Sequence, residues 1–198
     1  MLDSLKEGIQ FIRTRVAMES LIVLAFLMTL LGIPLVVFLP VIARDVFHQG
    51  PGTYTILLSC SGAGSVVGAL VVAAIGNASN KGRKALLMLI VLGMLMAAFA
   101  ISRWLWVSAI LLFLAGGVLI SVFAMITSLV QLITTDVMRG RVMSVYNVAF
   151  RGGMPFGSLT TGALVPHLTA PVVLCINGVL LSVLGLYFLI VHRKVASL

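Results

Sequence analysis

Arg151 stands in one of the most apolar stretches of the chain, "NVAFRGGMPFG", residues 147–157. Its guanidinium is always charged and carries N–H donors in a planar fork, which suits it to grip a carboxylate or phosphate at two points. Polar residues recur around it at spacings of three and four, with Met154 filling one interval, so they share one helix face. With Gln131 of the preceding apolar run, they are the candidate substrate-contacting, cavity-lining residues: Ser144, Asn147, Arg151, Ser158 and Thr161.

The rest of the sequence offers no catalytic set. It contains no HExxH or GxSxG motif and no paired carboxylates inside an apolar run, and its three histidines fall at loop or terminal positions. Cys60 and Cys175 lie in apolar runs without CxxC or metal-ligand spacing, so we expect buried, inert thiols. We therefore expect no enzyme activity, no cofactor and no metal.

The composition is that of an integral membrane protein. Of 198 residues, 61% are hydrophobic and 9% are charged, with a mean hydropathy of +1.23, whereas soluble domains carry about 25% charged residues. A net charge of +8 would suggest nucleic acid in a soluble chain. Here the cations fall in short clusters between apolar runs, which excludes nucleic acid and makes the lipid bilayer the expected partner.

Six apolar runs approach or exceed the ~20 residues that a membrane-crossing helix needs. They are too long for barrel strands of about 10 residues, and the short connections leave no room for a soluble catalytic domain. The predicted fold is therefore all-α, with six transmembrane helices. The predicted spans are about 20–43, 54–76, 85–102, 105–133, 142–165 and 171–191.

Residues 1–19 differ from the rest, because apolar residues recur there every three or four positions between charged ones. This pattern predicts a short amphipathic helix on the cytoplasmic face; the alternative is a frayed, charged tail. The apolar positions are Leu2, Leu5, Ile9, Ile12 and Val16.

Positive charges predict the orientation, because lysine and arginine accumulate on the cytoplasmic side. Ten cations flank the spans on the side of both termini: Lys6, Arg13, Arg15, Lys81, Arg83, Lys84, Arg139, Arg141, Arg193 and Lys194. The opposite side has only Arg44 and Arg103, and Arg151 belongs to neither. Both termini are therefore expected in the cytoplasm. Interfacial aromatic residues fit these limits, with Tyr54, Trp104 and Trp106 at outer ends and Tyr146 and Tyr187 near inner ones.

Arg151 lies ten residues beyond Arg141, about 15 Å into a hydrocarbon core roughly 30 Å thick. A charge at that depth costs from about 3 to more than 10 kcal/mol, so it must face protein or a water-filled cavity. All five acids lie outside the spans or at their ends: Asp3, Glu7, Glu19, Asp45 and Asp136. Two interpretations stay open, a structural lock through an ion pair or backbone carbonyls, and a contact with substrate or gate.

Two pairs of glycines predict close helix contacts. Gly64 and Gly68 in the second span, and Gly153 and Gly157 in the fifth, are each separated by three residues. Small residues at this spacing let two helices approach closely in a membrane, where no hydrophobic drive brings them together.

Three stretches resemble the C-terminal half of major facilitator superfamily transporters: "KEGIQFIRTR", "FLPVIARDVFHQGPGTYTILLSCSGAGSVVGAL" and "TDVMRGRVMSVYNVAFRGGMPFGSLTTGAL". The resemblance covers essentially the whole chain and is nearest to bacterial drug and siderophore exporters, such as the enterobactin exporter and macrolide efflux proteins. In that family, two six-helix halves surround a central cavity and are joined by a cytoplasmic linker.

The resemblance implies that residues 1–19 end that linker and that the six spans are the family's seventh to twelfth. It further implies efflux of small molecules by alternating access, as an antiporter in the bacterial inner membrane, with an N-terminal half or a second copy as partner. The rival hypothesis is a non-transporting assembly or regulatory subunit derived from a half-transporter.

The loop "GNASNKGRK" resembles the family's cytoplasmic gate motif, but Asn80 replaces the acid and one spacer is missing. Without the resemblance, the loop is explained by its cations, which mark the cytoplasmic side of the membrane, and by its small residues, which form a tight turn. By resemblance, this loop and the next inner loop supply the candidate gate residues Lys81, Arg83, Lys84, Asp136, Arg139 and Arg141.

The charge distribution makes a direct prediction about topology. In Gly50→Cys and Asn80→Cys variants, a membrane-impermeant thiol reagent added to intact cells should label position 50 and leave position 80 protected. Labelling of position 80 with protection of position 50 would overturn the orientation.

Overall fold

The computed structural model describes residues 2–48, 50–75 and 80–191, and over these residues the chain is helical without strands. The fold-class prediction, an all-α membrane protein, is confirmed. The helices are α1 (Leu2–Arg13), α2 (Val16–Gly32), α3 (Pro34–Val37), α4 (Leu39–Asp45), α5 (Pro51–Ile75), α6 (Lys81–Ile101), α7 (Leu105–Leu132), α8 (Arg139–Leu168) and α9 (Ala170–Ile190).

The N-terminal helix is shorter than the expected 1–19. Helix α1 ends at Arg13, where the Thr14 hydroxyl donates to the Phe11 carbonyl, and Arg15 takes an extended conformation with φ −128° and ψ 96°. Helix α2 then begins at Val16 rather than at residue 20. The amphipathic and membrane segments are therefore separate helices joined by a sharp turn.

The first predicted span, 20–43, is not one helix but three, α2, α3 and α4. Proline lacks the N–H that would continue the backbone ladder and clashes with the carbonyl four residues earlier. Pro34 and Pro40 stand at the N-terminal ends of α3 and α4, respectively. Pro34 leaves the Leu30 carbonyl without its usual helical donor, at a place where α8 approaches.

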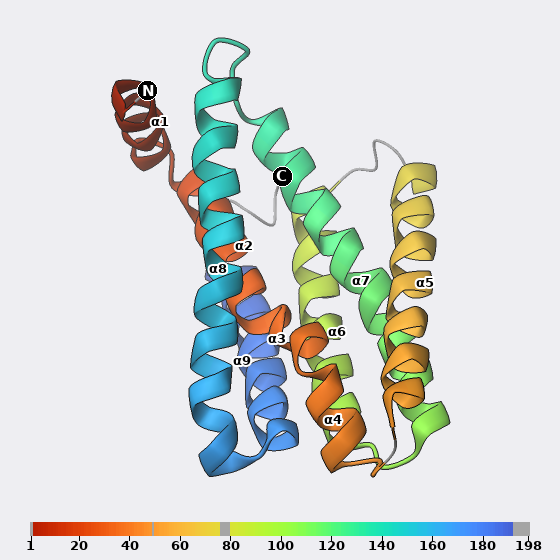
Figure 1. Cartoon of the computed structure of the whole chain (residues 1–198). Coiled ribbons are helices and arrows are strands. Elements are labelled where there is room, and N and C mark those ends of the chain that lie inside the picture. Colours follow the sequence, from red (N-terminus) through yellow and green to blue (C-terminus); the bar gives the residue numbers. More distant parts are fainter. Residues whose placement is uncertain (1, 49, 76–79, 192–198) are drawn as a thin grey trace.

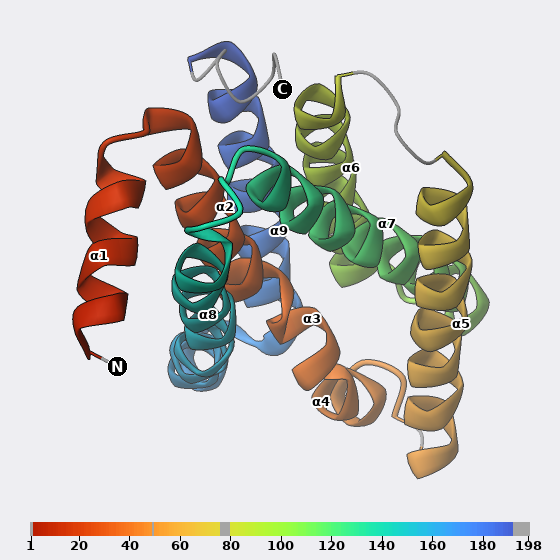
Figure 2. The same cartoon turned by 90° about the horizontal axis from the view of Figure 1, so that it is seen from above.

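The long helices run between the same two ends of the molecule (Figure 1). The start of α2, the end of α5, the start of α6 and the α7–α8 turn lie at one end, called here the inner end. Helix α4, the start of α5, and the α6–α7 and α8–α9 turns lie at the other, the outer end. Seen along the bundle, α6 and α9 occupy one side and α3 and α4 the other, with α1 beside α8 at one edge and α5 at the opposite edge (Figure 2).

Five segments are long and apolar enough to cross a membrane: Val16–Val37, Pro51–Ala74, Lys81–Ile101, Leu105–Leu132 and Ala170–Ile190. Helix α8, which contains the expected fifth span, is not among them. It carries Arg139, Arg141 and Arg151 along with prolines at 155 and 166, so its mean hydropathy is low although it has 30 residues.

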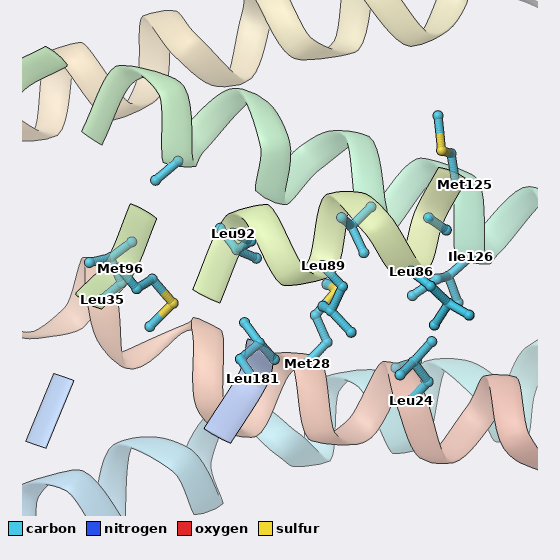
Figure 3. Packing of buried hydrophobic residues seen from close by; sticks show 14 of the residues in the cluster. Leu24, Met28, Leu35, Leu86, Leu89, Leu92, Met96, Met125, Ile126 and Leu181 are labelled. Atoms are coloured by element: carbon cyan, nitrogen blue, oxygen red, sulfur yellow. The ribbon is translucent and has the colours of Figure 1, made fainter. Parts of the chain in front are cut away.

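The apolar core joins α2 to α6, α7 and α9. Figure 3 shows Leu24 and Met28 of α2 facing Leu86 and Leu89 of α6. All four side chains are almost completely buried. Unlike these, Cys60 and Cys175 are only partly buried, so the expectation of buried thiols is wrong for both.

Helices α5 and α7 touch backbone to backbone. A Cβ on Gly64 would overlap the Phe113 carbonyl, and one on Gly68 would lie 2.6 Å from the Cα of Gly117. The Ser65 hydroxyl donates to the Gly116 carbonyl across this contact at 3.2 Å. Outside this contact, most side chains of α5 are exposed.

This contact predicts a contrast between two glycines of α5. Gly68→Leu forces α5 and α7 apart and should destabilise the protein by about 1–3 kcal/mol or more, as overpacked sites do. Gly62→Leu is the matched control, because a Cβ there meets nothing within 4 Å. Thermal unfolding in detergent measures both; equal stability of the two variants would contradict the packing.

Candidate functional site

Helix α8 packs against α2 through its two glycines. A Cβ on Gly153 would lie 2.6 Å from the Phe26 carbonyl oxygen, and one on Gly157 would overlap the Leu30 carbonyl that Pro34 leaves without a donor. Arg151 is two residues before Gly153, about 200° around a helix of 3.6 residues per turn. The α2 contact therefore turns Arg151 away from the rest of its own bundle.

Arg151 is exposed, and it lies about 18 Å along α8 from Arg139 at 1.5 Å per residue. Within the part of the chain that the structure describes, no hydrogen bond or ion pair reaches it. Asn147, one turn earlier, is also exposed. Large apolar side chains lie beside Arg151 on the exposed side of the helix, at Val148 (65% exposed) and Leu159 (70% exposed). A cation and an amide thus sit in an otherwise apolar surface.

The polar stripe divides in two. Ser144 is exposed and bonds to its own helix at Gly140, while Ser158 is half-buried. Thr161 is 2% exposed and accepts a hydrogen bond from Asn177 Nδ2 of α9 at 3.2 Å. The structure therefore brings Ser144 and Asn147 to the exposed face with Arg151 and places Thr161 inside the bundle.

Asn177 was missed among the site candidates, although an asparagine inside the apolar run 171–191 is itself a signal of a buried polar partner. Gln131 lies in the last turn of α7, at the inner end, and is exposed. It does not share the depth of Arg151.

Tyr146 is not interfacial as expected but 1% exposed. Its hydroxyl lies 2.8 Å from that of Thr127 on α7, and its ring stacks on Phe150, which contacts Phe123. This aromatic contact ties the first half of α8 to α7. A buried tyrosine was not foreseen because Tyr146 stands only a few residues from the charged turn.

The candidate gate residues of the α7–α8 turn are held by ion pairs. Asp136 Oδ1 lies 2.7 Å from Arg139 Nη2, and Arg141 pairs with Glu7 of α1. The Gly8 position packs against the Arg141 backbone, and Arg15 donates to the Ile133 carbonyl at 3.2 Å. Helix α1 thus contacts the α8 side of this turn, and the α1–α2 connection contacts the α7 side.

The other candidate gate residues begin α6. Lys81 Nζ lies 3.4 Å from Ser128 Oγ of α7, Arg83 is exposed and Lys84 is half-buried. Asn80 precedes the helix with a positive φ of 59°. The residues 76–79, which include most of the expected gate motif before Asn80, lie outside the described residues.

The outer end carries Arg44 and Arg103. Arg44 Nε donates to Asp45 Oδ1 at 2.6 Å, and this hydrogen bond holds the pKa of the Asp45 carboxyl below its usual value. Across residues 2–48, 50–75 and 80–191, no three histidine, cysteine, aspartate or glutamate side chains come together as metal ligands would.

The chain matches the family described as transmembrane secretion effector over residues 1–197. This match, together with the apolar helices, shows that the protein is a multi-pass membrane protein of major facilitator type, and it belongs to the transmembrane secretion effector family. No curated protein and no solved structure is significantly similar to it.

The Thr161–Asn177 bond predicts different effects at two adjacent threonines. Thr161→Val leaves the Asn177 amide unpaired in an apolar interior and should cost about 1–3 kcal/mol of stability. Thr160→Val is the matched control, because Thr160 is exposed and bonds only to its own helix; its cost should stay below about 0.5 kcal/mol. Chemical or thermal unfolding in detergent measures both, and equal losses would mean that the buried bond is not made.

Proposed function

We propose that the chain is a six-span half of a secondary transporter, which exports small amphipathic or anionic molecules by alternating access across the bacterial inner membrane. The observation that carries this proposal is Arg151, an unpaired cation on an exposed, mainly apolar face of a helix that lies among membrane-crossing helices. Membership of the transmembrane secretion effector family supports it.

In this proposal, helix α8 also crosses the membrane, which adds one span to the five candidates. Its 30 residues measure about 45 Å, against a hydrocarbon core of roughly 30 Å. It starts at the inner end, where α7 stops, and finishes at the outer end, where α9 starts (Figure 1). Because α7 and α9 are both candidate spans, the segment between them has to cross the same thickness. Its low hydropathy reflects a helix that faces a polar cavity on one side.

The exposed face of α8 matches an amphipathic anion. The guanidinium of Arg151 offers a bidentate contact to a carboxylate or phosphate, and Asn147 adds an amide on the same face. Val148 and Leu159 offer apolar surface to the remainder of the substrate. The proton carrier of an antiporter does not lie beside Arg151 in this chain, so we place it in the partner half.

A partner completes the site. In lipid, an unpaired arginine at this depth would cost several kcal/mol, so the face around Arg151 has to line water or protein. An N-terminal six-helix half, or a second copy, supplies the other wall. Both termini and the α7–α8 turn then lie in the cytoplasm, where the cations of the inner end collect.

Arg151 should be required for efflux of anionic substrates. In bacteria that express the chain with the N-terminal half of a family member, Arg151→Ala should lower efflux of an anionic fluorescein dye at least tenfold, because a charge-assisted hydrogen bond contributes about 1.5–3 kcal/mol. Arg151→Lys should retain more activity, since it keeps the charge but loses the fork. Efflux of cationic ethidium should change little.

Arg44→Ala is the matched control, an arginine variant at the outer end that should leave efflux of both dyes unchanged. Efflux of the anionic dye that survives Arg151→Leu would contradict the role of Arg151. If the two halves together export neither dye nor any other tested amphipath, the non-transporting subunit becomes the better explanation.

A further inference from the structure

A small hollow opens at the outer end between α6 and α9. It has a volume of about 380 Å³ and is lined by Ala100, Ile101, Arg103, Pro171, Val172, Cys175 and Ile176. All of these except Arg103 are apolar or thiol side chains, so the hollow accepts a hydrocarbon segment. None of these residues belongs to α2 or α8, and the proposed transport path does not use the hollow.

Arg103 supplies a free positive charge at this hollow. It is exposed, and among the residues that the structure describes, no carboxylate pairs with it. The other outer arginine, Arg44, borders a hollow of about 310 Å³ between α4 and α5, but its charge is held by Asp45. The two hollows therefore differ in their available charge.

The surroundings of Arg103 are those of a bilayer interface. Trp104 and Trp106 follow it in the chain and are 76% and 73% exposed. Exposed tryptophans gather at the level of the lipid headgroups, with the ring partly among the acyl chains. Both α6 and α9 are candidate membrane spans, and the hollow lies where α6 ends and α9 begins. Arg103 is thus at headgroup level, with the apolar lining on the hydrocarbon side.

We propose that this hollow is a binding site for an anionic phospholipid, with the phosphate on Arg103 and the upper part of one acyl chain between α6 and α9. A basic residue near the membrane surface favours an anionic lipid about fivefold, which corresponds to ~1 kcal/mol. A neutral hollow would hold any lipid equally, so the unpaired charge is what makes this site selective. The site rests on the membrane placement alone and does not depend on transport.

The chain's two tryptophans, Trp104 and Trp106, follow Arg103 within three positions, so their fluorescence reports on lipid bound near Arg103. The protein is reconstituted in phosphatidylcholine vesicles in which the mole fraction of brominated phosphatidylglycerol, or in a parallel series of brominated phosphatidylcholine, is raised stepwise, with bromine near the glycerol end of the chain. Bromine quenches tryptophan on contact. We expect the anionic lipid to quench at about fivefold lower mole fraction, and unlabelled phosphatidylglycerol to relieve that quenching.

Three variants test whether Arg103 causes the preference for the anionic lipid. Arg103→Gln should abolish the difference between the two lipids, and Arg103→Lys should keep it. Arg44→Gln is the matched control, and it should leave the difference intact, because Arg44 is already paired. Thermal unfolding of each variant checks that the fold is kept.

Three results would overturn the proposal. Equal quenching by both lipids in the unmodified protein would show that the hollow does not select charge. A preference that survives Arg103→Gln would place the selectivity elsewhere. Loss of the preference when inorganic phosphate is added at constant ionic strength would show that the site takes a free anion instead of a lipid.

Discussion

Close backbone contact through glycine is the constraint on which this bundle depends. Lipid removes the hydrophobic drive between helices, so association relies on packing and on hydrogen bonds. Among the residues that the structure describes, a Cβ on glycine would come within 3.0 Å of a neighbouring helix's backbone in three helix pairs: α5 with α7 at Gly64 and Gly68, α6 with α9 at Gly93 and Gly178, and α2 with α8 at Gly153 and Gly157. Serine adds cross-helix bonds in two of them, as Ser182 of α9 does to the Ile90 carbonyl of α6 at 3.1 Å. Side chains at these positions would separate the helices.

The α2–α8 contact links packing to the proposed function. Pro34 ends α2 and leaves the Leu30 carbonyl without a helical donor, and Gly157 packs where that carbonyl lies. With one face of α8 committed to α2, Arg151 necessarily points away from its own bundle. The same contact that stabilises the bundle therefore leaves this unpaired charge on its exposed surface, where the proposed site lies.

The sequence was sufficient for the features that follow from composition and local spacing. Apolar runs predicted the helical membrane fold, and the all-α class was confirmed. This class can be predicted from local sequence because each membrane helix satisfies its backbone hydrogen bonds within its own segment. The helix breaks at Pro34 and Pro40 were missed, since a proline inside an apolar run interrupts the helix but hardly changes the mean hydropathy of the run. The end of the N-terminal helix at Arg13 was missed because apolar periodicity continues to Val16 across the turn.

Partners across the bundle were harder to foresee. Periodicity put Thr161 on the stripe of Arg151, but 3–4 spacing drifts around a 30-residue helix, and by Thr161 the stripe has reached the α9 side. Gly93 is the single glycine of its run and Gly178 lies seven residues before Gly185, so no glycine pair at a spacing of four marked either of them. Glu7 and Arg141 are 134 residues apart, and only the tertiary fold brings α1 to the start of α8.

In the proposed transporter, the face of α8 around Arg151 lines water. The most direct test uses single cysteines at positions 147 and 151 and at Leu70, an exposed residue of α5, in a protein that lacks Cys60 and Cys175 and is expressed with the proposed partner half. An anionic, membrane-impermeant thiol reagent should modify positions 147 and 151 and leave position 70 unmodified. If all three positions are equally unreactive, the Arg151 face is sealed in lipid or protein and the account is contradicted.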